Sequence, residues 1–421
     1  MVSLFFLVIL SLPIFLLFLL KKNTTTKTSR LPPGPRLDSC NLQKHLWQLS
    51  QKYGPLFTLR LGFRRTLVAC SAIMAKEILK THDLEFCSRP VLTGQQKLSY
   101  NGLDLAFSRY GVCWREMRKI CVIHLFSSIR VQSFSPIREE EVSHMIAKIS
   151  ISDLDSEPFN LTEAMMSLTS TIICRIAFGK KFDAFYQQII DEHLDPNRSK
   201  PEHEDILDVL LQIYKDRPYK TQLTLDHIKA ILMNIFVAGT DTSAATVIWA
   251  IPGNKGYVNE NDVEQLSYLK AVVKETMRLQ PTAPLLIPRE TTKCKIDGYE
   301  IPAKTLVYVN AWAVGRDSEA WENPNEFNPD RFLGSSIDFK GQDFELIPFG
   351  SGRRICPGLD MGIATVELSL ANLLHKFDWE MPAGMRREDI DIDHVLPGIT
   401  THRRDPLCLM PKPYAVMGNS E

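Results

Sequence analysis

A glycine-rich loop with one cysteine, running directly into an apolar helical pattern, restricts the possible folds of this chain more than any other feature. Residues 348–358 read PFGSGRRICPG, and the helical pattern follows over 361–374. Two glycines ahead of Cys356 permit a tight turn with backbone angles that other residues avoid. Such a turn points backbone N–H groups at the sulfur. We therefore expect the sulfur to lie at a helix N-terminus, where the helix dipole and free N–H groups favour an anion.

Of the chemistries open to such a loop, metal binding by the thiolate fits best. Electropositive surroundings lower the pKa of a thiol, and a metal completes its deprotonation. The loop is no dinucleotide-binding fingerprint, because Ile355 holds the last glycine position, and it lacks a phosphate loop or a nucleophile elbow. A nucleophilic Cys356 would need a histidine; none is near in sequence, and pairing in space stays open. We expect Pro357 in the first turn of the next helix, and Gly358 to let a flat ligand approach.

The loop resembles the haem-binding signature of the cytochrome P450 superfamily. The signature F-x-x-G-x-R-x-C-x-G is matched by Phe349, Gly352, Arg354, Cys356 and Gly358. The chain as a whole is similar to the plant microsomal branch, and most to its family seventy-one. The resemblance implies haem b as the cofactor, with the Cys356 sulfur as axial ligand of the iron and the other four residues around the porphyrin.

The resemblance assigns further side chains to the haem propionates. Trp114 and Arg118 lie one helical turn apart, and Arg289 lies in a Pro-Arg-Glu sequence. By similarity, they bind the propionates together with Arg354. Two buried carboxylates require cationic partners, which these arginines supply. Taken alone, the Trp114 segment also fits an amphipathic surface helix with a half-buried tryptophan.

A polar sequence, AGTDTS over 238–243, interrupts the longest apolar helix pattern. Taken alone, it fits a packing kink as well as a site, since Ser and Thr hydroxyls bond back to i−4 carbonyls. By similarity, it lies over the oxygen-binding face of the haem. Thr242 would then hold a water on the oxygen, and Asp241 would connect to the proton supply. We expect both residues to be catalytic.

Glu275 and Arg278 form an E-x-x-R pair on one helix face, and Arg331 lies in a downstream Pro-Asp-Arg-Phe sequence. An isolated pair of this kind is usually solvated and contributes about 0.2–0.5 kcal/mol. By similarity, the three residues form a buried structural cluster, because a planar guanidinium can bind a carboxylate through two hydrogen bonds.

Hydrophobic periodicity predicts a mainly helical α+β domain. Helices are expected over 137–149, 225–250, 263–279 and 361–374. Thr224 is expected to cap the second helix, and Pro252-Gly253 to end it. Short strands are expected over 56–61, 66–69, 295–301 and 305–309. By resemblance this is the cytochrome P450 fold, with long helices and small segregated β-sheets.

Composition argues against some classes of function. Lys plus Arg and Asp plus Glu number 49 each, so the formal net charge is +0 and no nucleic-acid partner is expected. Nine cysteines without a C-x-x-C pair argue against a disulfide framework and favour a reducing, cytosol-facing compartment.

The N-terminal run over 2–20 has no charged residue and is just long enough to cross a bilayer as a helix. Lys21 and Lys22 follow it, which keeps the rest of the chain cytoplasmic. A cleaved signal peptide is the alternative; against it, no positive charge precedes the run and no small-residue cleavage site follows. The expected organisation is a single-pass endoplasmic reticulum anchor over 1–22, a polar and proline-rich hinge over 23–36, and a catalytic domain over 37–421.

Compared with the family pattern, the chain looks too short near 36–38, 182–186 and 249–258. The second interval normally holds helices that roof the substrate pocket. Flanking sequence matches on both sides, so these intervals look like internal deletions, as skipped or mis-predicted exons would give. A missing roof would expose the haem site to water.

The resemblance implies a monooxygenase, an oxidoreductase that hydroxylates a small lipophilic plant metabolite with O2. NADPH electrons would come from a separate NADPH–cytochrome P450 reductase, docked by basic groups around Arg115 and Lys119. By similarity, the pocket is lined by residues 98–110, 233–242, 283–288 and 397–401. Two alternatives stay open: a haem-binding membrane protein whose deletions abolish turnover, and a haem-thiolate isomerase or dehydratase. Retained Thr242 and Asp241 favour oxygen activation over the latter.

Overall fold

The structure, a computed structural model, describes most of the chain after residue 41. The described residues are 42–152, 157–181, 186–199, 201, 203–219, 222–251, 266–391, 395–396 and 398–413. The predicted anchor and hinge, the turn at Pro252-Gly253 and the interval 36–38 lie outside them. Most of the other two short intervals also lies outside.

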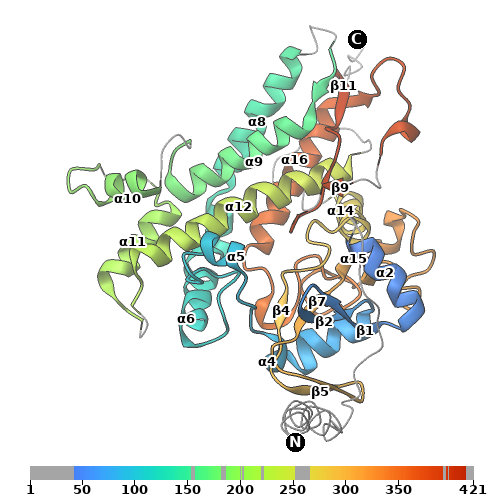
Figure 1. The fold of residues 1–421 in the computed structure, drawn as a ribbon. Coiled ribbons are helices and arrows are strands. Elements are labelled where there is room, and N and C mark those ends of the chain that lie inside the picture. The colour runs from blue at the N-terminus through green and yellow to red at the C-terminus, as the bar shows by residue number, and fades with distance from the viewer. Residues whose placement is uncertain are drawn as a thin grey trace, which may run out of the picture.

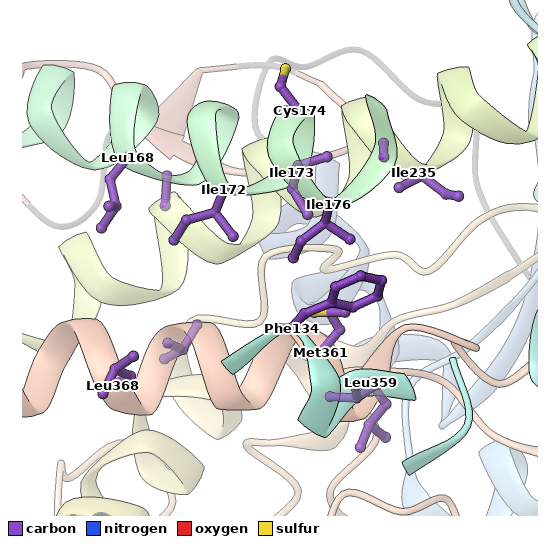
Figure 2. Close-up of a cluster of buried hydrophobic side chains, with 14 of the residues drawn as sticks. Phe134, Leu168, Ile172, Ile173, Cys174, Ile176, Ile235, Leu359, Met361 and Leu368 are labelled. Atoms are coloured by element: carbon purple, nitrogen blue, oxygen red, sulfur yellow. The ribbon is translucent and has the colours of Figure 1, made fainter. Parts of the chain in front are cut away.

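Four long helices form the body of the protein (Figure 1). They are α8 (Ser135–Ser152), α9 (Leu161–Phe178), α12 (Leu225–Ala250) and α16 (Leu359–Lys376). α12 contacts both α9 and α16, and Figure 2 shows apolar side chains of α9 and α16 in this core. Gly239 lets α12 approach α9 closely, since a Cβ there would lie 2.6 Å from Ile173. α9 and α12 are long and apolar enough to cross a membrane, but each is more than half buried in the protein, as core helices are.

Shorter helices surround this body. They are α2 (Leu42–Tyr53), α3 (Ala72–Lys76), η1 (Glu77–Thr81), α4 (Asp83–Phe86), α5 (Thr93–Leu98), α6 (Val112–Ile120), η2 (Cys121–Leu125), α7 (Ser128–Ser133), α10 (Tyr186–Leu194), α11 (Ile206–Asp216), α14 (Ser267–Leu279), α15 (Ala311–Val314), η4 (Pro329–Phe332), η5 (Gly352–Arg354) and η6 (Arg387–Asp389).

The strands form small separate sheets. One sheet has the order β1-β2-β7-β4, with β2 and β7 parallel and its other pairs antiparallel. The remaining sheets are β3-β11-β8, β5-β6 and β9-β10. The strands are β1 (Leu56–Leu61), β2 (Arg64–Ala69), β3 (Phe159–Asn160), β4 (Arg289–Glu290), β5 (Cys294–Ile296), β6 (Tyr299–Ile301), β7 (Leu306–Val309), β8 (Phe377–Glu380), β9 (Val395–Leu396), β10 (His402–Arg403) and β11 (Cys408–Pro413).

The predicted fold class, long helices with small segregated sheets, is confirmed. α12 has its predicted bounds, and the side chain of its N-cap Thr224 accepts a hydrogen bond from the His227 N–H. The single strand predicted over 295–301 is wrong, because the chain turns into the hairpin β5-β6. Asp297 and Gly298 have φ values of 48° and 77° at this turn, and an Asp-Gly pair favours such two-residue turns.

Glu275 lies at the centre of a buried ion network that joins α14 to the η4 region. Its side chain is fully buried; its carboxylate accepts from Arg278 at 2.6 and 2.7 Å and from Arg331 at 3.2 Å. It also accepts from the Asn328 N–H at 2.8 Å. Arg278 in turn donates to the carbonyls of Pro324 and Glu326. A buried charge is tolerated only when its hydrogen bonds are satisfied in this way, so we propose a structural role for this network.

Glu367 on α16 gives the fold a pH-dependent stability. Burial raises the pKa of its carboxyl from 4.5 to about 7, although the charges of Lys270 and Lys274 oppose the rise. The carboxyl binds its proton more tightly in the folded state than in the unfolded state. The folded protein therefore loses stability as the pH rises from 4.5 to about 7.

The substitution Glu367→Gln should therefore raise the thermal midpoint at about pH 8, where burying the carboxylate carries its full cost, and raise it less at about pH 5. Thermal unfolding followed by circular dichroism at both pH values measures this difference. A larger gain at the lower pH would contradict the assignment.

Candidate functional site

The cysteine loop is fixed by its own backbone before any ligand is considered. The Cys356 N–H donates to the Phe349 carbonyl at 3.0 Å, which closes the loop. Gly350 and Gly352 have φ values of 70° and 68°, the left-handed region that favours glycine. A Cβ on Gly352 would lie only 2.0 Å from the Leu79 carbonyl oxygen. The loop therefore packs against η1 through a position that only glycine can hold.

The Cys356 sulfur lies beside the start of α16, as predicted, but its pKa shifts the other way. Burial raises the pKa of the thiol, and the Gly358 N–H and the charge of Arg118 oppose the rise without cancelling it. The expectation that the surroundings alone would lower this pKa is thus wrong, because desolvation outweighs the Gly358 N–H and the charge of Arg118. Pro357 was placed wrongly too: α16 begins at Leu359 with Gly358 as its N-cap, so Pro357 precedes the helix. Deprotonation of the sulfur would have to come from a bound metal.

Three arginines are buried close together beside this loop. Arg89 and Arg289 are 4% exposed and Arg354 is 8% exposed. Burial lowers the pKa of Arg289 to about 10, and burial together with the charge of Arg289 lowers that of Arg354 to about 9. Burial and the same neighbouring charges also lower the pKa of Arg89. The site therefore holds an excess of buried positive charge.

Main-chain carbonyls satisfy two of these guanidiniums. Arg354 donates to the carbonyls of Cys87 at 2.8 Å and Ser108 at 2.7 Å. Its guanidinium lies 4.2 Å from the ring centroid of Trp114, whose indole N–H donates to the Leu105 carbonyl at 3.0 Å. Trp114 and Arg354 thus stack on each other and against the segment 105–108.

Arg89 ties two separate segments together. It donates to the carbonyls of Ala106 at 2.8 Å, Ile287 at 2.6 Å and Pro288 at 3.0 Å. It therefore positions the segment that leads into Arg289. Our sequence reasoning missed Arg89, because a lone arginine between Ser88 and Pro90 has no motif spacing to mark it.

Arg289 and Arg118 differ from their neighbours in their polar partners. Nη1 of Arg289 is buried without any hydrogen-bond partner among the described residues. The side chain of Arg118 likewise forms no hydrogen bond or ion pair with the described part of the chain, and burial lowers its pKa. Asp104, a nearby carboxyl, offers limited compensation because burial raises its pKa. An anion with carboxylate chemistry would complete this site, so the residues fit the two propionates of a haem.

Asp241 and Thr242 lie on α12 as predicted, and the next residue, Ser243, lies near Phe349 of the cysteine loop. A Cβ on Gly362 of α16 would lie 3.9 Å from the Phe349 ring and 4.0 Å from the Ser243 hydroxyl. The Thr242 hydroxyl donates to the Ala238 carbonyl at 2.6 Å, which is the back-bond expected of a helix kink. Its oxygen keeps lone pairs that can accept a hydrogen bond.

Both carboxylate oxygens of Asp241 are engaged by the C-terminal segment. Oδ1 lies 2.8 Å from Nε2 of His402, and Oδ2 accepts from the Thr400 hydroxyl. Partial burial opposes ionisation, but the hydrogen bonds from His402 and Thr400 prevail and lower the pKa of Asp241. Sequence reasoning placed 397–401 near the pocket but missed His402, since nothing in the sequence links it to a residue 161 positions earlier.

A cavity of about 260 Å³ brings together two of the four segments predicted to line the substrate pocket. Its lining includes Leu285, Leu286, Ile399 and Thr401, together with Leu92 and Gln95. Residues of the predicted segments 98–110 and 233–242 are not part of its lining. The cavity is therefore not lined by α12.

Gly352 and Gly358 form a matched pair for testing this geometry. Gly352→Ala should lower the thermal midpoint of the haem-free protein, because its Cβ collides with a carbonyl at a positive φ. Gly358→Ala should leave that midpoint nearly unchanged, since its nearest neighbour is the Phe126 ring at 3.8 Å. Both should lower haem content, measured as the Soret to protein absorbance ratio. Equal midpoints for the two variants would contradict the loop geometry.

Known proteins match this chain over nearly its whole length. The family model of cytochrome P450 matches residues 34–188, 180–252 and 250–408. A 5-OH-xanthotoxin synthase of Pastinaca sativa is 43% identical, over 95% of this chain and 96% of that protein. Cytochrome P450 71AP13 of Prunus mume is 40% identical, over 96% of this chain and 94% of that protein. Strychnine-11-hydroxylase of Strychnos nux-vomica is 39% identical, over 95% of each chain.

Solved structures show the same architecture. A zebra fish cytochrome P450, in a structure with progesterone, matches with a TM-score of 0.75. The match covers 89% of this chain and 100% of that chain at 24% sequence identity. At this identity the likeness concerns the fold alone.

Proposed function

The chain belongs to the cytochrome P450 family, and on this premise we propose that Cys356 and the surrounding buried arginines hold the haem for monooxygenation. The protein is an oxidoreductase of the plant type similar to family seventy-one. Haem b is its cofactor, and NADPH electrons reach it through a reductase. It uses O2 to oxidise a small plant metabolite.

The proposal assigns each residue a task that its position supports. When bound, the haem supplies electron transfer to O2 and its activation, which an axial thiolate favours. Cys356 would be the axial ligand. The absence of side chains at Gly352 and Gly358 would let a flat ring approach the backbone of the loop. Arg289, Arg118 and Arg354 would hold the propionates. The Trp114 indole N–H is taken by the Leu105 carbonyl, so Trp114 would instead support Arg354 by stacking on its guanidinium. Phe349 closes the loop through its carbonyl, which accepts from the Cys356 N–H.

The polar residues of α12 would serve proton delivery. Thr242 lies on the helix that passes the cysteine loop, and its hydroxyl oxygen can hold a water beside the reacting oxygen. Asp241 is next to it and half-exposed, so it can exchange protons with solvent. We assign Thr242 the positioning of that water and Asp241 the proton supply.

The unpartnered Nη1 of buried Arg289 carries this proposal most directly. A guanidinium buried among other cations is stable only if an anion completes its hydrogen bonds. Haem propionates would supply that anion. An isomerase or dehydratase would share these haem contacts, but no contact among the described residues favours that alternative.

The reduced, carbon monoxide-bound spectrum of the full chain tests thiolate ligation. The natural sequence should give a strongly red-shifted Soret band, because the axial ligand is a thiolate. Cys356→Ser should abolish that band, whereas the control Cys408→Ser should keep it. An unchanged spectrum in Cys356→Ser would overturn the assignment. Reductase-dependent NADPH oxidation then separates an enzyme with turnover from a haem-binding protein without it.

We also propose that this chain lacks segments of the family pattern near 182–186 and 249–258. The family model matches in three separate pieces, which overlap in this chain at 180–188 and 250–252. The alignment with the Pastinaca sativa relative runs over 493 positions, more than the 421 residues of this chain. A similar gap near 36–38 belongs to the same proposal, which would leave the pocket more open to water.

For its membrane location we propose a single-pass anchor over 1–22 in the endoplasmic reticulum, a hinge over 23–36 and a cytosolic catalytic domain. The uncharged apolar run and the following Lys21 and Lys22 support it. For the substrate, we propose xanthotoxin as the first probe, because one 43% identical relative is named for a hydroxylated xanthotoxin.

Reductase docking is proposed at the exposed side of α6. Arg115 and Lys119 are exposed, and they lie beside the rings of Tyr110 and Tyr219 respectively. The double reversal Arg115→Glu and Lys119→Glu should raise the apparent KM for reductase several-fold at low salt, because it removes attraction to an acidic partner. Steady-state NADPH oxidation with varied reductase measures it, with Lys44→Glu on α2 as control. An unchanged KM would exclude this surface.

A further inference from the structure

The C-terminal segment 400–402 contacts α12 at Trp249 and Asp241. Trp249 of α12 donates through its indole N–H to the Thr401 carbonyl at 3.4 Å, and the Thr401 N–H donates to the Thr282 carbonyl at 2.9 Å. The Thr401 hydroxyl reaches the Pro281 carbonyl at 3.3 Å. These contacts hold the segment between α12 and the loop after α14, independently of the side chain of His402.

We propose that His402 is a positioning residue for Asp241, which holds this carboxylate on the route by which protons reach Thr242. The inference deepens the proposed function and rests on it, because it takes Asp241 as the proton supply. His402 approaches Oδ1 of Asp241 through Nε2 at 2.8 Å, and Thr400 donates to Oδ2. With both oxygens held, the carboxylate has one orientation on the helix.

The charges around this pair single out His402 as the partner of Asp241. The side chains of His402 and Thr400 are the two that lower the pKa of Asp241. The next residue, Arg403, interacts instead with Asp391 and Asp405. Arg404 likewise pairs with Asp391 and Asp405. Arg403 and Arg404 therefore interact with acidic residues outside α12. Of these three residues, His402 alone contacts Asp241 of α12.

The exposure of the pair argues for a role beyond folding. The side chains of His402 and Asp241 are 26% and 27% exposed, and a polar contact this accessible to water contributes little to stability. Main-chain and Trp249 contacts already anchor the segment. The partial exposure does let solvent reach the carboxylate, as a proton route requires, while His402 and Thr400 fix its orientation.

Two substitutions separate positioning from bulk packing. His402→Phe keeps a ring but removes the donor to Asp241, and His402→Gln keeps an amide N–H that can reach the same oxygen. Haem-loaded full chain with saturating reductase and xanthotoxin would be assayed for NADPH oxidation in H2O and in D2O. We expect His402→Phe to slow oxidation several-fold and to increase the solvent isotope effect, because proton delivery becomes more limiting. His402→Gln should have an oxidation rate and a solvent isotope effect close to those of the natural sequence.

Controls make the outcomes distinguishable. Arg404→Gln, on the exposed turn, should match the natural sequence, and Thr400→Val, which removes the second donor, should shift the isotope effect in the direction of His402→Phe. The carbon monoxide-bound Soret band and the haem content should be unchanged in every variant, which shows that the fold is intact.

If Asp241→Asn slows oxidation and raises the isotope effect but His402→Phe does neither, the inference fails and the proposed function stands. If neither variant changes them, the proton role of Asp241 fails as well. Equal loss in His402→Phe and His402→Gln would also overturn the positioning role.

Discussion

Buried positive charge beside the cysteine loop is the constraint on which the rest of the site depends. Arg89, Arg289 and Arg354 are removed from water almost completely, and each such charge costs several kcal/mol unless it is paired. Hydrogen bonds from Arg89 and Arg354 to main-chain carbonyls in 87–108 and 287–288 offset part of this desolvation cost. Segments far apart in sequence thus converge on the same three guanidiniums. The remaining charge calls for an anionic ligand, and haem propionates meet that demand.

At Cys356, the fold sets the position of the sulfur but does not promote its ionisation. The backbone places the sulfur beside the α16 N-terminus through two left-handed glycines and a close approach to Leu79. Burial nevertheless raises the pKa of the thiol above its ordinary value. The protein therefore prepares the position of the sulfur and leaves its deprotonation to the metal. A cysteine of this kind is poorly suited to act as a free nucleophile, because the thiolate is the reactive form.

α12 serves the core and the site with opposite faces. Its apolar residues pack on α9, where Gly239 permits close contact, while Asp241 and Thr242 form a polar break on the same helix. His402 of the C-terminal segment contacts Asp241. The same segment lines the cavity through Ile399, together with Leu285 and with Tyr308 of β7. Contacts to the haem and to the proton route can therefore survive in a chain that is short in the intervals proposed to be deleted.

Local signals in the sequence determined the cysteine loop, the bounds of α12 and its Thr224 cap, and the helical fold class, because each depends on residues close together in the chain. Resemblance to a family supplied the ion network of Glu275, Arg278 and Arg331 and the site residues, whose convergence the sequence alone could not show. Only the tertiary structure decided the raised pKa of Cys356, the brace formed by Arg89 and the pairing of Asp241 with His402. Desolvation and long-range contacts depend on which segments meet in space, and no periodicity or local motif encodes that meeting.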